Sequence, residues 1–287
     1  MYHSRRDFIQ TAGLLTAGSL IGLPELTSCK QTNQSFLKDL GFITNIIEKE
    51  INADWRGTLE KVAGMGYKYF ESGEIYGDSL EDYLKFLKNI GLTPLTAGAS
   101  MAQFLDEESF AEILTRGHDL DAKYIVCYWP WMSDALNLTP DEIKAAADNL
   151  NRIGEKCKTE NFTFAWHNHD KEFKTVNEMI PFDYLLSNTD PAVCKVEIDL
   201  YWIYKGNDEP LHYFKKYPGR FELVHMKDMD DTAERSFACV GDGIIDFPSI
   251  LEKSELAGMQ HLIVEHDHPE NGLECIQRSY DYIQSIL

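Results

Sequence analysis

The sequence contains few cysteines, and none of them have the CxxC spacing typical of redox motifs and zinc clusters. Six cysteines occur among the 287 residues, the first at position 29. The others are odd in number, widely spaced and mostly placed in apolar runs, so we expect packing residues rather than a disulfide framework. These residues are Cys127, Cys157, Cys194, Cys239 and Cys275.

Positive charge is also scarce. The chain has 27 Lys and Arg residues against 47 Asp and Glu residues, which gives a formal net charge of −20. Such an acidic protein is repelled by nucleic acid and by anionic membrane surfaces, so neither is expected as a partner. Because the acidic residues are dispersed along the chain, we interpret them as a solubilising surface.

The chain lacks an apolar run long enough to span a bilayer well. Residues 11–23 are weakly apolar, follow the pair Arg5-Arg6, and precede Leu26-Thr-Ser-Cys29, which resembles a bacterial lipobox. This pattern predicts a twin-arginine signal peptide over residues 1–28 and a tether over residues 29–37. We expect an exported protein, periplasmic or held at the membrane only through a lipid anchor; the alternative is an ordinary N-terminal helix.

No glycine-rich phosphate-binding turn follows the first apolar segment, and no internal repeat stands out. This absence disfavours a doubly wound open sheet. Strand-like runs instead alternate with helix-like stretches, which predicts a single (β/α)8 TIM barrel over residues 38–287. The strand-like runs cover residues 39–44, 67–71, 93–98, 123–128, 162–169, 193–199, 221–227 and 261–266.

Three helix starts are marked by capping residues. Asp54 and Ser79 each precede an amphipathic stretch, and Thr139 is followed by Pro140 at the first helical position. The last of these helices is expected to run to Lys158.

Four segments in the second half of the chain end in side chains that bind metals. They end at His167-Asn-His-Asp170, Glu197-Ile-Asp199, His225-Met-Lys-Asp228 and Glu265-His-Asp267. The carboxyl ends of barrel strands meet around a common axis, so these side chains are expected to converge. Strand alternation places His167, His169, Asp199, His225 and Glu265 on the inward face. His167 and His169, two residues apart on the same strand, are expected to be about 6.6 Å apart.

The chain resembles the xylose-isomerase-like TIM barrels, a family of sugar phosphate isomerases and epimerases. The resemblance covers nearly all of residues 38–287 and rests on the matching segments 57–71, 166–173, 199–202, 225–228, 240–247 and 264–267. It implies one divalent cation (Mn, Zn, Co or Mg) bound by Asp199, His225 and Glu265. Where many members of the family have Glu, this chain has His167-Asn-His169, so the fourth ligand is either His167, which we favour, or Glu172.

The resemblance also implies a metal-dependent isomerase or epimerase acting on a carbohydrate through an enediolate. Glu265 can serve as ligand and base, and His169 or Glu172 as the opposite proton carrier. An exported enzyme is expected to meet sugars without phosphate. A lyase or dehydratase acting on 3-keto glycosides, and a lipid-anchored sugar-binding protein without turnover, are the alternatives.

Several residues are open to two interpretations. Lys227 either donates to the substrate or forms a salt bridge, and Glu197 is interpreted as a buried charge neutralised by Lys195 or Lys227. We assign Glu71, Trp129 and Trp202 to substrate binding, while packing is the alternative for the two tryptophans. Asp267 and His268 either join the site or lie in a solvated loop. The sequence carries no signal for the oligomeric state.

Overall fold

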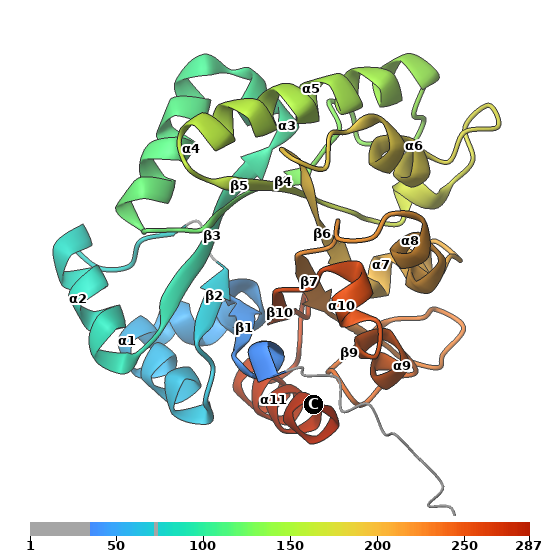
Figure 1. Cartoon of the computed structure of the whole chain (residues 1–287). Coiled ribbons are helices and arrows are strands. Elements are labelled where there is room, and N and C mark those ends of the chain that lie inside the picture. Colours follow the sequence, from blue (N-terminus) through green and yellow to red (C-terminus); the bar gives the residue numbers. More distant parts are fainter. Residues whose placement is uncertain (1–34, 72–73) are drawn as a thin grey trace, which may run out of the picture. The chain divides into compact units, whose positions relative to one another are not determined.

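The computed structural model describes residues 35–71 and 74–287. These residues form a closed barrel of parallel strands in the order β1-β10-β7-β6-β5-β4-β3-β2, with helices around the outside (Figure 1). The predicted (β/α)8 barrel is therefore confirmed. The predicted signal peptide and the lipobox at Cys29 lie outside the described residues.

Each of the expected strand-like runs overlaps one strand of the barrel. Six strands are shorter than the expected runs, while the strands in the runs 93–98 and 123–128 extend past the expected ends. The barrel strands are β1 (Leu40–Ile43), β2 (Tyr69–Glu71), β3 (Thr93–Ser100), β4 (Tyr124–Trp129), β5 (Thr163–His167), β6 (Lys195–Asp199), β7 (Leu223–Met226) and β10 (His261–Val264).

The expected capping residues begin their helices. The Ser79 hydroxyl accepts a hydrogen bond from Asp82 N at 3.1 Å, and the Thr139 hydroxyl accepts one from Glu142 N at 3.2 Å. Asp54 has extended backbone inside a longer helical stretch, and its carboxylate accepts from Gly57 N at 3.0 Å, so it caps the helix that follows. The helices are α1 (Glu48–Met65), α2 (Leu80–Ile90), α3 (Met101–Leu105), α4 (Glu107–Asp119), α5 (Pro140–Thr159), α6 (Pro181–Asn188), α7 (Leu200–Lys205), α8 (Pro210–Lys216), α9 (Phe247–Leu251), α10 (Ser254–Ala257) and α11 (Gly272–Ile286), and the 3₁₀ turns are Ser35–Lys38, Thr44–Ile47 and Lys171–Phe173.

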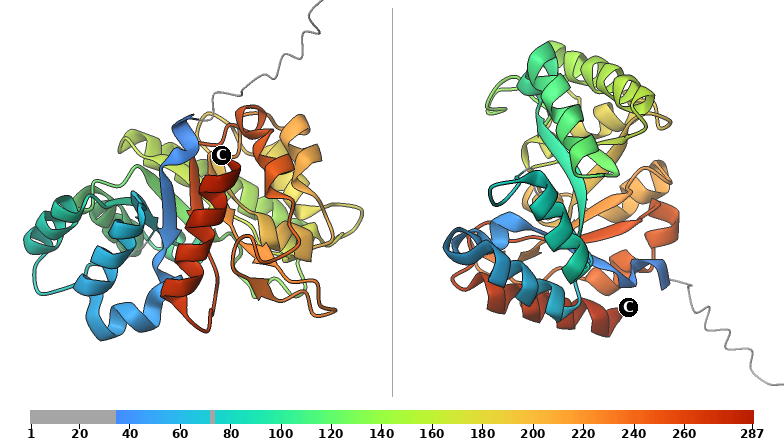
Figure 2. Two further views of the ribbon diagram at one scale, coloured as in Figure 1. Left: turned by 90° about the horizontal axis from the view of Figure 1, so that it is seen from below. Right: turned by 90° about the vertical axis from the view of Figure 1, so that its left-hand side faces the viewer.

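The apolar side chains form two separate layers, as strand alternation requires. One fills the barrel and consists of Leu95, Tyr124, Val126, Ala165, Leu223 and Ile263. The other lies between the strands and the helices, where α1 and α11 pack side by side (Figure 2). No helix within residues 35–71 and 74–287 has the length and apolarity needed to cross a membrane.

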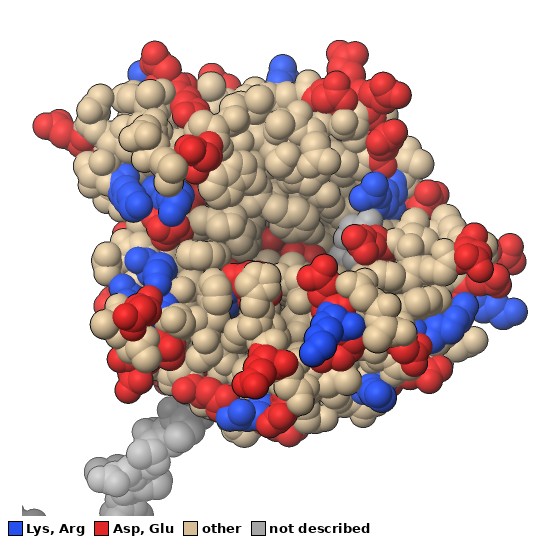
Figure 3. Space-filling view, turned by 180° about the vertical axis from the view of Figure 1, so that it is seen from behind, with Lys and Arg blue, Asp and Glu red and all other residues tan. Residues whose placement is uncertain are grey.

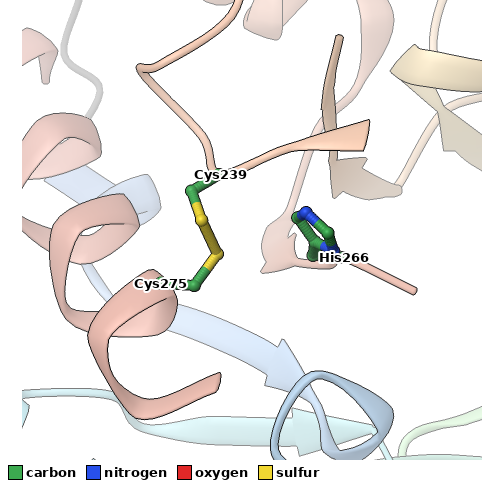
Figure 4. Close-up of side chains that lie close together, drawn as sticks. All are labelled: Cys239, His266 and Cys275. Carbon is green, nitrogen blue, oxygen red and sulfur yellow. A yellow bond between two sulfur atoms is a disulfide. The ribbon is translucent and has the colours of Figure 1, made fainter. Parts of the chain in front are cut away.

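A small hairpin follows the seventh barrel strand and was not expected. Its strands β8 (Asp228–Met229) and β9 (Phe237–Ala238) pair antiparallel beside the rim. A disulfide joins Cys239, after β9, to Cys275 on α11, with the His266 ring next to it (Figure 4). The expectation that the cysteines only pack is therefore wrong for this pair, because folding brings together residues 36 positions apart. Cys127, Cys157 and Cys194 are free and buried, as predicted.

Candidate metal centre

The four predicted ligands come from neighbouring strands at one end of the barrel. His167 ends β5, Asp199 ends β6, His225 lies in β7, and Glu265 directly follows β10. Strand register places Asp199 beside His225. All four side chains are buried. The carboxyl ends of the strands lie on the face shown in Figure 3, where acidic side chains are visible inside a hollow.

The ligand atoms of these residues converge. Nitrogen and oxygen atoms of His167, Asp199 and His225 all lie within 4.8 Å of one another. Nε2 of His167 is 3.8 Å from Asp199 Oδ2, and Nδ1 of His225 is 2.6 Å from Glu265 Oε2. Within the described residues, Asp199 Oδ2, Glu265 Oε2 and both ring nitrogens of His225 have no well-aligned hydrogen bond. Buried polar atoms without partners are costly, and a divalent cation would satisfy this set of donors.

Burial shifts the protonation of these groups. It raises the pKa of Asp199 to about 8, against the opposing effect of Lys227. The pKa of His167 is well below its usual range because of burial and the nearby His225. Burial alone would lower the pKa of His225, but Glu197 and Glu265 raise it well above the usual range. The protein alone therefore carries protons in this cluster, and a cation would have to displace them.

Lys227 is the buried cation of the site. Its Nζ lies 2.8 Å from Asp267, 3.2 Å from Glu265 and 3.8 Å from Asp199. Burial alone would raise the pKa of Glu265, but Lys227 and His225 hold it well below its usual range. Glu265 is therefore ionised at neutral pH. Because Asp267 pairs with Lys227 and is only 26% exposed, it belongs to the site rather than to a solvated loop.

Glu197 is not neutralised by a lysine, so that interpretation was wrong. Lys195 points the other way and pairs with Glu222 at 3.2 Å, while Lys227 pairs with the acids at the rim. Glu197 instead faces two imidazoles, 3.2 Å from His167 and 3.5 Å from His225. It lies one inward position below Asp199 on the same strand, where the Lys227 side chain does not reach.

Glu71, which was assigned to substrate binding, lies 3.3 Å from His225 Nε2. It also lines a cavity of about 340 Å³ above β1 and β2, together with Asn45 and Tyr128. Asn45 Oδ1 and both oxygens of Glu71 are buried, with no well-aligned hydrogen bond in the described part of the chain. This cavity borders the metal cluster and offers polar atoms to a small molecule.

His169 lies beyond the strand that was expected to contain it. β5 ends at His167, because the Asn168 side chain takes over the pairing with β6: it accepts from Asp199 N at 3.0 Å and donates to Asp199 O at 3.3 Å. The chain then turns, and the His167 and His169 rings pack edge to face with centroids 4.9 Å apart. The two histidines are thus in contact rather than separated along a strand.

The two predicted tryptophans both contact His169. The Trp129 and Trp202 ring centroids lie 5.0 and 5.5 Å from the His169 ring centroid. Burial, followed by the charge of Lys227, lowers the pKa of His169 to about 4. Its imidazole is therefore neutral at physiological pH and able to accept a proton.

Each carboxylate oxygen of Glu172 accepts a hydrogen bond. It accepts from Trp131 Nε1 at 2.7 Å and from His169 N at 2.9 Å. Burial raises the pKa of Glu172 to about 7, against these hydrogen bonds. The arrangement fixes the turn that carries His169 and leaves no oxygen of Glu172 free of a protein partner.

Three supporting residues were missed from the sequence: Asn168, Trp131 and Asp228. Asp228 anchors the loop after the hairpin, since its carboxylate accepts from Met229 N, Gly241 N, Gly243 N and Ile245 N at 2.8–3.2 Å. The sequence feature that points to this role of Asp228 is the segment Gly241-Asp-Gly243. Only a residue without a side chain fits at position 243, because a Cβ on Gly243 would lie 2.3 Å from the Asp228 carboxylate. No pattern in the sequence marked Asn168 or Trp131.

Named proteins with similar sequences are dehydratases. An inosose dehydratase from Clostridium beijerinckii is 27% identical over 79% of this chain and 87% of its own length. An inosose dehydratase from Clostridium tetani is 26% identical over 60% of this chain, and the matched part spans only 63% of that protein.

Solved structures share the fold. A sugar phosphate isomerase/epimerase from Parabacteroides distasonis superposes with a TM-score of 0.74 at 24% identity, over 86% of this chain and 93% of its own. The IolI protein, whose crystal structure contains a bound zinc atom, superposes with a TM-score of 0.67 at 19% identity, over 86% of this chain and 97% of its own. The family model of xylose isomerase-like TIM barrels matches residues 59–286, so this chain belongs to that family.

Proposed function

We propose that this protein is a metal-dependent enzyme that removes a proton next to the carbonyl group of a polyhydroxylated substrate, acting as an isomerase or epimerase. The observation that carries the proposal is the convergence of ligand atoms of the buried residues His167, Asp199 and His225 within 4.8 Å of one another, where Asp199 Oδ2 and both ring nitrogens of His225 have no well-aligned hydrogen bond in the described residues. We assign these three residues and Glu265 as ligands of one divalent cation. A cation bound there would supply a Lewis acid for the substrate carbonyl and the adjacent hydroxyl.

The surrounding side chains fit proton transfer. Glu265 is ionised and is our candidate base, with Lys227 holding its charge at 3.2 Å. His169 is neutral and is our candidate for the second proton carrier, and its ring lies against Trp129 and Trp202. Glu172 positions the backbone of His169 through its hydrogen bond.

We propose that the substrate is a carbohydrate without phosphate. Five acidic side chains lie beside His225 or Lys227, and three of them pair with Lys227. An acidic mouth repels a phosphate group and accepts neutral hydroxyl groups. The acids are Glu71, Glu197, Asp199, Glu265 and Asp267.

A second candidate reaction is the dehydration of a keto sugar or keto cyclitol. It is favoured by the similarity to inosose dehydratases, one of which is covered over 87% of its length. Both reactions begin with the same proton abstraction. Dehydration differs in the second step, in which a hydroxyl group would leave and a proton that His169 takes up from solvent would convert it to water.

One experiment tests both reactions. The purified protein, with Mn²⁺ or with a chelator, is incubated in D₂O with a panel of aldoses, ketoses, inososes and 3-keto glycosides, and products are followed by NMR and mass spectrometry. Deuterium on carbon without loss of mass indicates isomerisation or epimerisation, whereas loss of water or of the glycosidic group indicates elimination. A panel without exchange or elimination in the presence of metal would refute the proposal and favour a sugar-binding protein.

A further inference from the structure

We propose that Glu197 positions both imidazoles of the metal centre and holds them in opposite tautomers. The inference rests on the proposed function only in taking His167 and His225 as metal ligands. It assigns a role to a buried carboxylate that is not one of the four proposed ligands and that forms no lysine salt bridge within the described residues.

The contacts of Glu197 divide cleanly between its two oxygens. Oε2 lies 3.2 Å from Nδ1 of His167, and Oε1 lies 3.5 Å from Nε2 of His225. The carboxylate is fully buried, so water does not compete for these oxygens. Neither contact is a well-aligned hydrogen bond in the described residues, and hydrogen bonds around a catalytic centre are often long or poorly aligned until the centre is filled.

The other nitrogen of each ring faces the metal cluster. Nε2 of His167 is 3.8 Å from Asp199, and Nδ1 of His225 is 2.6 Å from Glu265 and 3.9 Å from Asp199. A neutral imidazole has one N–H donor and one nitrogen free to bind a metal. Glu197 accepts from the N–H, so His167 binds through Nε2 and His225 binds through Nδ1.

The strand register explains how one carboxylate reaches both rings. His167 at the end of β5 is level with Glu197 in the neighbouring β6, and Asp199, two residues further, is level with His225 in β7. Glu197 and Asp199 thus lie on the same inward face, one below and one at the level of the cation. Carboxylates behind metal-bound histidines orient the rings and raise their basicity.

Glu71 provides a matched comparison. Its carboxylate lies 3.3 Å from Nε2 of His225, and no ion pair in the described part of the chain joins it to His167. It comes from β2, which is three strands from β5 and three strands from β7 in the closed barrel. Removing its charge should therefore affect His225 while leaving the partner of His167 in place.

The first test reads the tautomers in the wild-type protein. Zn²⁺ is added to the full chain, and the histidine tautomers are assigned from long-range ¹H–¹⁵N correlation spectra, with His167→Gln and His225→Gln used to identify the signals. We expect an Nδ1–H tautomer for His167 and an Nε2–H tautomer for His225. Two histidines in the same tautomer would overturn the inference.

The second test compares Glu197→Gln with Glu71→Gln. A glutamine at 197 has one acceptor oxygen and one donor amide, so it can accept from only one of the two rings. We expect Glu197→Gln to weaken Zn²⁺ binding by roughly 10–100-fold, the usual effect of removing such a partner, and to change the tautomer of one histidine. Glu71→Gln should keep the tautomer of His167 and lose less affinity, as measured by competition with a chelator.

Both measurements are independent of turnover. Glu197→Gln with wild-type Zn²⁺ affinity and both original tautomers would show that Glu197 has no positioning role. If the protein exchanges no substrate proton but His167 and His225 show the two different tautomers expected above, the proposed reaction is refuted and this inference is supported. A protein that binds no divalent cation at all would overturn both.

Discussion

His225 Nδ1 and Glu265 Oε2 lie 2.6 Å apart, so an imidazole from β7 and the carboxylate that follows β10 are in direct contact at the rim of the barrel. Against the effect of burial, Glu197 and then Glu265 raise the pKa of the histidine, while Lys227 and then His225 lower the pKa of the glutamate, so each member of the pair helps to stabilise the charged form of the other. A cation bound between them would replace the proton that they share. We therefore expect metal binding to release a proton from this pair.

The first prediction concerns Asp199. One of its oxygens accepts from Trp202 N at 2.9 Å and caps α7, while the other faces both histidines. Asp199→Ala should sharply reduce metal content, and Asp199→Asn should do so while keeping the cap oxygen. Far-UV circular dichroism should remain as in the wild type for Asp199→Asn.

Metal content is measured by elemental analysis after dialysis against Mn²⁺ or Zn²⁺. Asp267→Asn is the matched control, since Asp267 pairs with Lys227 and not with the histidines. Full metal occupancy in Asp199→Ala would show that the cation site is assigned wrongly.

The second prediction separates the two histidines of the β5 end. His169→Gln should keep its metal and lose turnover by roughly 10²–10⁴, the range for losing a general acid or base. His167→Gln should weaken metal binding, so that added Mn²⁺ partly restores its activity. Exchanged phenotypes would reverse the two roles.

Glu172→Gln supplies the third prediction. Because both Glu172 oxygens accept hydrogen bonds, from Trp131 and from the His169 backbone, its loss should reduce turnover by disturbing His169 and leave metal content unchanged. Elemental analysis and steady-state rates are measured on the same samples. Loss of metal in this variant, together with retained metal in His167→Gln, would make Glu172 the fourth ligand instead of His167.

The barrel and the inward-facing residues could be predicted because strand alternation and capping are local properties of the sequence. His167, Asp199 and His225 are brought together as that alternation required. The features that could not be predicted depend on contacts between residues that are far apart in the sequence. Lys195 and Lys227 were predicted wrongly as partners of Glu197. Whether two inward-facing side chains meet depends on how far along the barrel axis each of them lies. The Cys239–Cys275 bond joins two segments that only the closed barrel places side by side.

The fourth prediction concerns this disulfide. It joins residues 36 positions apart, and closing a loop of that length in the unfolded chain stabilises the folded state by about 3–4 kcal/mol in the chain-entropy model. Cys239→Ala/Cys275→Ala should lower the free energy of unfolding by up to this amount, measured by denaturant titration. Reductant should destabilise the wild type similarly and leave the double variant unchanged. A wild type that is insensitive to reductant would contradict the prediction.

The fifth prediction concerns export, which the sequence of the first 29 residues suggests and the disulfide supports, since such bonds persist in oxidising compartments. In cell fractionation we expect the protein in the membrane fraction outside the cytoplasm. Cys29→Ala should release it from the membrane, because no lipid would be attached. Arg5→Lys/Arg6→Lys should instead keep it inside the cell, because the twin-arginine signal is lost. Such export moves folded proteins, so the metal would be acquired before the membrane is crossed. A wild-type protein that stays cytosolic with Met1 intact would show that the N-terminal segment is not an export signal.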